Sequence, residues 1–513
     1  MKAELLDIMP EITDRERAEE FSDQLENLLV EVGGIFPRAD LRMRAARCIR
    51  GLLSPVSRKN GWQLAEYGGD AEPWGQQHLL DRSVWDVDAL RDFTRRYVID
   101  GLDDGGRGAG PGGAGVLVVD ETGFAKKGRA SVGVARQYSG TLGGVFPCQI
   151  GVMAAWATGR GQALIDREIY QPREWTEDRA RCRAAHVPDT VGFATKPRLA
   201  EQMIARTLPN LPEDRVWVAA DEVYGRDGAF RVFLEEHHLP YAVNVQANHT
   251  VLPRPGWRHA ARLVERHAAE DDWVTLPAGP SQLDSRVWQW WVRPIPDPEA
   301  ETGDGAWARW FIARRRPQTP TGRDYYLAWG PPETTVEELV CVPGARWRVE
   351  EAIKLAKSAA GMADYEVRSF HGWYRHITLA QLAAAFLAVQ AAAATRDEEP
   401  APAPTASRRS CTPAWTRLPA TQGDLADPTS PTGTAAIAFT AYEIARLLWV
   451  MAPQPTPAER IRHGLHWSWW RRCHQAVARA CHRRRNHARE AEHPTARPPP
   501  TGPQTTAGPL ISN

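Results

Sequence analysis

Val216-Trp-Val-Ala-Ala-Asp221 is a short apolar run that ends in an aspartate, and Gly115-Val-Leu-Val-Val-Asp120 shows the same pattern earlier in the chain. A nearly continuous apolar run of this length is typical of a strand that is buried on both faces. Segments with helical spacing separate and follow the two runs, which predicts an α/β fold class. Because side chains leave the core where a strand of such a sheet ends, both aspartates are expected to meet solvent there.

A third acid, Glu350, lies in a predicted helix with a distinctive neighbourhood. Arg346, Glu350, Lys354 and Lys357 stand at i−4, i, i+4 and i+7, so they share one helical face. The adjacent face is apolar and can pack on a sheet. Each acid also has an ordinary explanation, since aspartates at strand ends often cap helices and a helix face with Arg, Glu and Lys is usually solvated. Together the three make a site for phosphodiester chemistry a candidate, and the ordinary explanation stays open beside it.

Three carboxylates suit that chemistry because they can hold a pair of hard cations. Two ions about 4 Å apart can activate an attacking water or 3′-hydroxyl and stabilise the leaving oxygen. Mg²⁺ prefers oxygen ligands and keeps several waters, so the expected cofactor is two Mg²⁺ or Mn²⁺ ions bound by Asp120, Asp221 and Glu350. Arg346 and Lys357 are expected to grip the phosphates beside the cut.

Composition is that of an ordinary soluble globular protein. The chain has 513 residues, 43% of them hydrophobic and 25% charged, and its 63 basic and 63 acidic residues give no net charge. A surface that binds nucleic acid must therefore come from local clustering of basic residues. The seven cysteines form no evident disulfide framework and we expect neither a signal peptide nor a membrane span, which favours a reducing cytoplasm.

Changes in pattern along the chain predict its domain organisation. Residues 1–105 are read as an N-terminal helical region, and a β-rich insertion is expected to interrupt a core of two parts. The predicted segments after the first are 115–246 (core, first part), 247–332 (insertion), 333–395 (core, helical part with the third acid), 396–435 (disordered linker), 436–489 (basic helical block) and 490–513 (disordered tail).

Three separated motifs resemble the DDE transposases of bacterial insertion sequences, in particular the insertion-sequence 701 family, which is related to the insertion-sequence 4 group. The motifs are Val118-Val-Asp-Glu-Thr-Gly-Phe-Ala-Lys-Lys-Gly128, Ala220-Asp-Glu-Val-Tyr-Gly225 and Arg346-Trp-Arg-Val-Glu-Glu-Ala-Ile-Lys-Leu-Ala-Lys357. The resemblance covers residues 36–395 and 467–485. It implies an RNase H-like catalytic core in which Asp120, Asp221 and Glu350 bind the metal ions.

The resemblance also distinguishes among neighbouring acids. The wider group has Tyr, Arg, Glu and Lys at fixed spacing, and of the acids nearby Glu350 alone has Arg and Lys at the required places. The tyrosine place falls on Pro343, so this chain departs from the pattern there. Glu121 and Glu222 follow the two aspartates and are expected to point the other way on a continuing strand, although either could support the metal ligands from behind.

Several basic segments are candidates for DNA contact. Residues 460–489 hold arginines, histidines and three tryptophans but no acid before residue 490, which suits phosphate binding, although the tryptophans could instead pack on a core. The pairs Cys473-His474 and Cys481-His482 match no common zinc finger. Residues 38–58 are the candidates for reading the ends of the element. The predicted DNA-binding residues are Lys126, Lys127, Lys354, Arg471, Arg472, Arg483, Arg484 and Arg485.

The resemblance implies an enzyme that cuts double-stranded DNA at the terminal inverted repeats of an insertion sequence and joins it to target DNA. By analogy with similar transposases, a homodimer on paired ends is expected, in the bacterial cytoplasm at the nucleoid. Two alternatives stay open: an inactive or domesticated relative that binds DNA without cutting it, and a metal-dependent nuclease of repair or defence. The tryptophans at 288, 290 and 291 are expected in a β core, with stacking on a flipped base as the less favoured role.

Overall fold

The computed structural model describes residues 11–103, 105, 110, 113–212, 216–251, 259–277, 287–295, 307–398 and 438–492. They belong to two compact units that divide between Pro453 and Gln454. Except for the ends of two helices, the predicted linker 396–435 and tail 490–513 lie outside the described residues. Of the seven cysteines, Cys411 lies outside them too, and the six described cysteines are unpaired.

Helices form the N-terminal part of the first unit, as the spacing of apolar residues predicts. Asp86 caps the last of these helices by accepting hydrogen bonds from the backbone N–H groups of Asp88 and Ala89, both at 2.9 Å. Leu90 and Val98 of that helix are fully buried. The helices are α1 (Glu11–Gly33), α2 (Ala39–Leu53), α3 (Gly61–Tyr67), α4 (Trp74–Asp81) and α5 (Val87–Gly101).

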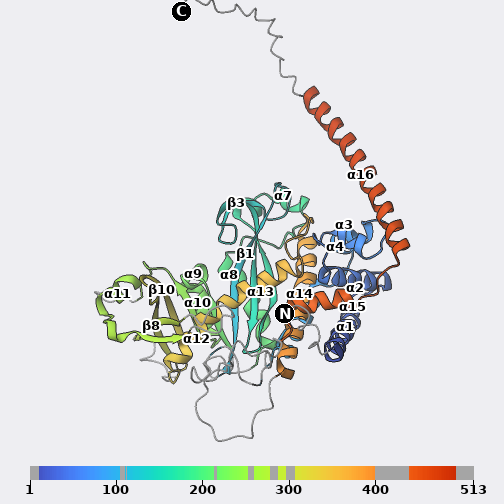
Figure 1. Cartoon of the computed structure of the whole chain (residues 1–513). Helices are drawn as coiled ribbons and strands as arrows, with labels where there is room; N and C mark the ends of the chain where they lie inside the picture. Colours follow the sequence, from blue (N-terminus) through green and yellow to red (C-terminus); the bar gives the residue numbers. More distant parts are fainter. Residues whose placement is uncertain are drawn as a thin grey trace, which may run out of the picture. The chain divides into compact units, whose positions relative to one another are not determined.

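A mixed ten-stranded sheet is the centre of the first unit (Figure 1). Its order is β2-β3-β1-β5-β6-β10-β9-β8-β7, and β4 pairs with β3. Strands β1, β5 and β6 are parallel, whereas the other pairs are antiparallel. The strands are β1 (Gly115–Ala125), β2 (Ala135–Ser139), β3 (Gly144–Ala157), β4 (Gln162–Tyr170), β5 (Val216–Ala220), β6 (Tyr241–Val245), β7 (Val274–Pro277), β8 (Val287–Ile295), β9 (Ala308–Arg316) and β10 (Thr319–Gly330).

The expectation that the first strand ends at Asp120 is wrong. Strand β1 continues to Ala125 and stays paired with β3, with Asp120 opposite Met153 and Ala125 opposite Cys148. The polar residues from 120 to 122 do not stop the strand because β3 supplies a neighbour along its whole length. Strand β5 does end before Asp221, as predicted.

The β-rich segment after β6 is joined to the sheet of the core. Strand β10 pairs with β6, with Tyr325 opposite Val245 and Trp329 opposite Tyr241, and β9, β8 and β7 follow outward. A separate apolar cluster that includes Trp291 and Phe311 packs under this end of the sheet. Trp290 and Trp291 are buried. The insertion therefore extends the sheet, and its boundaries at 247 and 332 stay predictions.

Helices cover both faces of the sheet. Residues of α13 share a core with Val116 and Val118 of β1, whereas residues of α8 share one with Leu117 and Val119, which alternate with them (Figure 1). The remaining helices of the first unit are α6 (Arg173–Thr176), α7 (Arg179–Ala184), α8 (Lys196–Thr207), α9 (Glu222–Gly225), α10 (Gly228–Glu236), α11 (Ala260–His267), α12 (Val336–Ala345), α13 (Trp347–Ser358), α14 (Phe370–Glu398) and α15 (Ala441–Met451), with short 3₁₀ turns at Leu208–Asn210 and Glu270–Asp272.

The helical part of the core that the sequence predicts over residues 333–395 is broken in the structure. Helix α13 ends at Ser358 and α14 begins at Phe370. Between them Gly361 has φ +63°, in the left-handed region that favours glycine, and a Cβ there would lie 2.5 Å from the side chain of Lys59. The turn thus needs a glycine both for its backbone and for the approach of the buried lysine.

Helix α14 combines length with an apolar composition, unlike the other helices that the structure describes. Residues 370–395 are long and apolar enough to cross a membrane by length and composition, but 89% of the most apolar window is buried inside the protein. Such burial is typical of the core helix of a globular protein.

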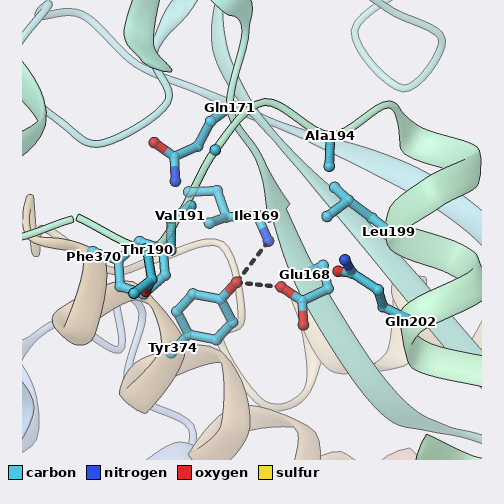
Figure 2. Close-up of a pocket in the computed structure, with 11 residues that line it drawn as sticks. Glu168, Ile169, Gln171, Thr190, Val191, Ala194, Leu199, Gln202, Phe370 and Tyr374 are labelled. Atoms are coloured by element: carbon cyan, nitrogen blue, oxygen red, sulfur yellow. Dashed lines mark hydrogen bonds between the residues drawn. The ribbon is translucent and has the colours of Figure 1, made fainter. Parts of the chain in front are cut away.

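Tyr374 joins α14 to the edge strand β4. Its hydroxyl donates a hydrogen bond to Glu168 and accepts one from the backbone N–H of Ile169 at 3.3 Å (Figure 2). A cavity of about 220 Å³ lies beside this contact, and residues from β4, α8 and the start of α14 line it. Tyr374 therefore fixes the first turns of α14 against the sheet.

The second unit contains helix α16 (Pro457–Glu492). Aromatic side chains pack against one another along it: the rings of Trp467 and Trp470 lie 5.3 Å apart, and Trp470 stacks on His474 at 5.0 Å. Its arginines at positions 472, 483, 484 and 485 are exposed. The helix thus has exposed positive charge at several positions.

A buried ion cluster around Asp166 links the sheet to two helices. Asp166 on β4 has no exposed surface, and it accepts hydrogen bonds from Arg95 of α5 at 2.6 Å and from Arg206 of α8 at 2.7 and 2.8 Å. Burial raises the pKa of Asp166, but hydrogen bonds and charge from Arg206, with charge from Arg167 and Arg95, outweigh it and hold the pKa below its usual range. The carboxylate is ionised and fully paired.

Replacement of Asp166 by alanine is expected to destabilise the protein strongly. It would remove the buried carboxylate that Arg95 and Arg206 share and leave them only Asp92 and Glu168 as acidic partners, a loss of about 3–5 kcal/mol. Urea unfolding followed by circular dichroism measures it. The control is Asp189→Ala, which breaks the exposed pair with Arg179 and is expected to change stability little. Equal losses in the two variants would contradict the role given to the cluster.

Candidate active site

The parallel pairing of β1 with β5 places two aspartates side by side. Val119 is opposite Ala220 in the register, so Asp120 and Asp221 follow at neighbouring positions. Asp221 caps the short helix α9 and accepts a hydrogen bond from the N–H of Val223 at 2.8 Å. Asp120 accepts one from the N–H of Glu121 at 2.7 Å. Both carboxylates are thus oriented by the backbone.

Glu350 is tied to Asp120 through an arginine. Arg346 lies where α12 meets α13, and it donates to Glu350 at 2.9 Å and contacts Asp120 at 3.4 Å. Helix α13 packs on the sheet through its buried face, as its sequence pattern predicts. The buried residues of that face are Val349, Ala352, Ile353 and Ala356. The structure therefore brings Asp120, Arg346 and Glu350 together on one face of β1.

The carboxylate that comes closest to both aspartates is that of Glu121. One carboxylate oxygen from each of Asp120, Glu121 and Asp221 lies within 4.8 Å of the others. The partners of Glu121 lie on the opposite face of the sheet from Arg346: Lys196 of α8 forms an ion pair with it, and Tyr224 of α9 donates a hydrogen bond at 3.2 Å. Its strand position thus points away, as predicted, but its longer side chain still reaches the aspartates.

The sequence pattern predicts only a supporting role for Glu121. The signal that identifies it is three-dimensional, because Lys196 and Tyr224 come from helices far along the chain. Among the described residues, Asp120, Glu121 and Asp221 form the only cluster of His, Cys, Asp and Glu whose geometry suits a metal ion. The cysteines and histidines at 473, 474, 481 and 482 form none within that part of the chain.

Burial and mutual repulsion raise the pKa values of the two aspartates. Burial, with the neighbouring charge of Asp221, raises the pKa of Asp120 to about 7. Burial and the charge of Glu121 raise the pKa of Asp221 to about 6. Burial lowers the pKa of Arg346, but Asp120 and Glu350 outweigh it and the pKa is raised. The cluster therefore holds more negative charge than its surroundings can neutralise.

Oxygen donors in this arrangement fit a hard divalent cation. Mg²⁺ and Mn²⁺ bind carboxylates and water in preference to nitrogen or sulfur ligands. Burial and mutual repulsion raise both pKa values, and a cation at the cluster would offset both effects, so the donor set and its electrostatics agree. Asp120, Glu121 and Asp221 could hold it, with Glu350 near Asp120.

The predicted lysines occupy different environments. Lys357 lies beside β1, where it donates to Thr122 Oγ1 at 2.6 Å and to the carbonyl of Gly123 at 3.0 Å, and burial lowers its pKa to about 8. Lys126 lies over the ring of Tyr365, 3.5 Å from its centroid, and burial lowers its pKa to about 8 as well. Lys354 is exposed. Lys357 therefore lies against β1 at Thr122 and Gly123, and Lys354 faces solvent.

Comparison with known proteins identifies the class. Residues 31–307 match the family described as DDE superfamily endonuclease, and the chain belongs to this family. The matched segment contains Asp120, Glu121 and Asp221, while Glu350 lies beyond it.

A curated relative points to a narrower group. The chain is 27% identical over 333 residues to a protein of Microchaete diplosiphon described as a probable transposase for insertion sequence element IS701. The similarity covers 62% of this chain and 75% of the relative.

Replacement of Asp120 by asparagine is expected to stabilise the metal-free protein at pH 8. A carboxyl group whose pKa is higher in the folded chain, here about 7 against 3.8, destabilises the fold once the pH exceeds both values. The effect disappears below the ordinary pKa. The gain at pH 8 is on the order of 3 kcal/mol and falls toward zero near pH 4.

Urea unfolding in EDTA at the two pH values measures this gain. Addition of Mg²⁺ is expected to stabilise the unaltered protein more than Asp120→Asn, because binding to the folded state adds to its stability. The matched control is Asp227→Asn, a capping aspartate at the start of α10 for which asparagine is an equally good cap. A variant less stable than the parent at pH 8 would contradict the account of the cluster.

Proposed function

We propose that the protein is a transposase that cleaves DNA at the ends of an insertion sequence and joins it to target DNA. The observation that carries the proposal is the convergence of Asp120, Asp221 and Glu121 oxygens, with Glu350 held beside them by Arg346. Membership of the endonuclease family supports the chemistry, and the similarity to a probable transposase for insertion sequence element IS701 supports the substrate. The strands β4-β3-β1-β5-β6 are proposed as an RNase H-like core.

Two Mg²⁺ or Mn²⁺ ions are proposed as cofactors, with Asp120, Asp221 and Glu350 as the ligands carried over from the family motif. When bound, they would activate the attacking hydroxyl and stabilise the leaving oxygen. Glu121 lies close enough to add a ligand or to orient one. The number of ions is part of the proposal.

Cationic side chains around the acids are proposed to position the DNA. Arg346 already bridges two carboxylates, and its planar guanidinium can hold a phosphate with paired hydrogen bonds. Lys357 is fixed by Thr122 and Gly123, and its pKa of about 8 leaves it mostly protonated at neutral pH. Both can neutralise charge on the phosphate at the cut without moving far.

Alanine at Asp120, Asp221 or Glu350 is expected to abolish strand cleavage while DNA binding is largely kept. Each change removes a carboxylate from the metal site, whereas DNA is held by basic residues elsewhere. The assay uses labelled duplexes that carry the inverted repeats flanking the coding region, with Mg²⁺ or Mn²⁺, and a gel-shift measurement of binding in parallel.

The matched control is Glu222→Ala, an exposed acid next to Asp221. Full cleavage by Asp221→Ala would refute the assignment of the site. Binding without cleavage by the unaltered protein would favour an inactive, DNA-binding relative. Cleavage without joining of a 3′-hydroxyl end to target DNA would favour a nuclease of repair or defence.

DNA contact by the basic helix α16 is a second part of the proposal. Its exposed arginines and its lack of acids between Glu459 and Glu490 suit phosphate binding. The predicted contacts Arg471, Arg472 and Arg483–Arg485 lie on it, whereas Lys126, Lys127 and Lys354 belong to the first unit. We also propose that the protein acts as a homodimer on paired element ends, at the bacterial nucleoid.

Glutamine at positions 483, 484 and 485 together is expected to weaken DNA binding across all sequences. Log K for binding falls as log salt concentration rises, and each lost phosphate contact is expected to make this negative slope shallower by about 0.9. Fluorescence anisotropy over a salt series measures the slope. The control replaces Arg262 and Arg266, two exposed arginines of α11, by glutamine. An unchanged slope in the triple variant would show that these arginines do not contact phosphates.

A further inference from the structure

The hairpin formed by β2 and β3 carries exposed aromatic side chains on both of its faces. Tyr138 is opposite Val145 in the register, while Phe146 is opposite Gln137 on the alternate face. Tyr138 is 66% exposed, Val145 51% and Phe146 46%. Large apolar side chains gathered at a hairpin tip usually mark a contact surface.

This hairpin is fixed beside the carboxylate cluster. Thr141 in its turn lies 3.3 Å from Thr122, measured between the two hydroxyl oxygens, and Thr122 is two residues past Asp120 on β1. The turn also approaches Gly123 so closely that a Cβ there would lie 2.2 Å from the hydroxyl of Ser139. The hairpin turn therefore contacts β1 at Thr122, two residues past Asp120.

Charge in this part of the chain has one sign. No aspartate or glutamate occurs between Glu121 and Asp166, although the whole chain has 63 acidic residues. The basic residues of the segment are Lys126, Lys127, Arg129, Arg136 and Arg160. Lys127, Arg129 and Arg136 are exposed. Aromatic rings among cations without acids suit single-stranded nucleic acid, whose bases stack while its phosphates attract positive charge.

We propose that the β2–β3 hairpin is a wedge that holds apart unpaired bases of the DNA next to the cleavage site. Tyr138 stacks on a base from one side of the hairpin and Phe146 on a base from the other, while Arg136 contacts the backbone. Aromatic side chains on both faces fit two separated strands better than one continuous strand. The proposal rests on the proposed function, since it takes element-end DNA as the ligand.

Binding measured without metal tests the wedge separately from cleavage. The probes are two fluorescein-labelled duplexes in EDTA, one fully paired and one with a short mismatched stretch at the cleavage site. The unaltered protein is expected to bind the mismatched duplex more tightly. Tyr138→Ala and Phe146→Ala are each expected to weaken that binding about 10-fold and to leave binding of the paired duplex nearly unchanged.

Three controls sharpen the result. Tyr138→Phe keeps the ring and is expected to bind like the unaltered protein. Val232→Ala removes an exposed apolar side chain on α10 and is expected to change nothing. Sedimentation of the DNA-free protein reports self-association, the other use of an exposed apolar patch.

Two outcomes would overturn the wedge. One is equal binding of the mismatched duplex by the alanine variants and the unaltered protein. The other is a DNA-free dimer that the alanine changes convert to a monomer. A protein that shows the aromatic dependence but never cleaves would refute the proposed function and leave the wedge standing.

Discussion

The parallel register of β1 and β5 is the constraint on which the site depends. It puts Asp120 beside Asp221 in a buried place, where two like charges repel each other and lack water. A cation on each face of the sheet partly offsets this negative charge: Arg346 pairs with Asp120 on one face, and Lys196 pairs with Glu121 on the other. The helices α13 and α8, which flank β1, therefore place positive charge next to the acids that the pairing of β1 with β5 brings together.

Much of this site follows from the sequence, because its determinants are local. The apolar runs before Asp120 and Asp221 identify two strands of the sheet, and the spacing of Arg346 and Glu350 predicts their contact on one turn of helix. Such features depend on periodicities of two residues in strands and 3.6 residues in helices. These periodicities can be read from the sequence without knowledge of the tertiary structure.

What the sequence did not reveal depends on distant partners. The continuation of β1 past Asp120 is decided by β3, and the position of Glu121 by Lys196 and Tyr224. The break after Ser358 depends on Gly361 and on the lysine that packs against it. Likewise, the pairing of β10 with β6 joins the insertion to the core sheet. No local sequence pattern specifies which strand of the core sheet β10 pairs with.

The distribution of charge links these features to the handling of DNA. A cluster of carboxylates repels phosphate, so a DNA strand cannot rest there unless positive charge compensates. The chain supplies that charge next to the cluster: Lys357 lies against β1, and the segment that follows Glu121 is free of acids up to Asp166. A bound divalent cation would complete the compensation. Docking of the scissile phosphate and binding of metal should therefore reinforce each other, while the basic residues farther away hold the DNA in either case.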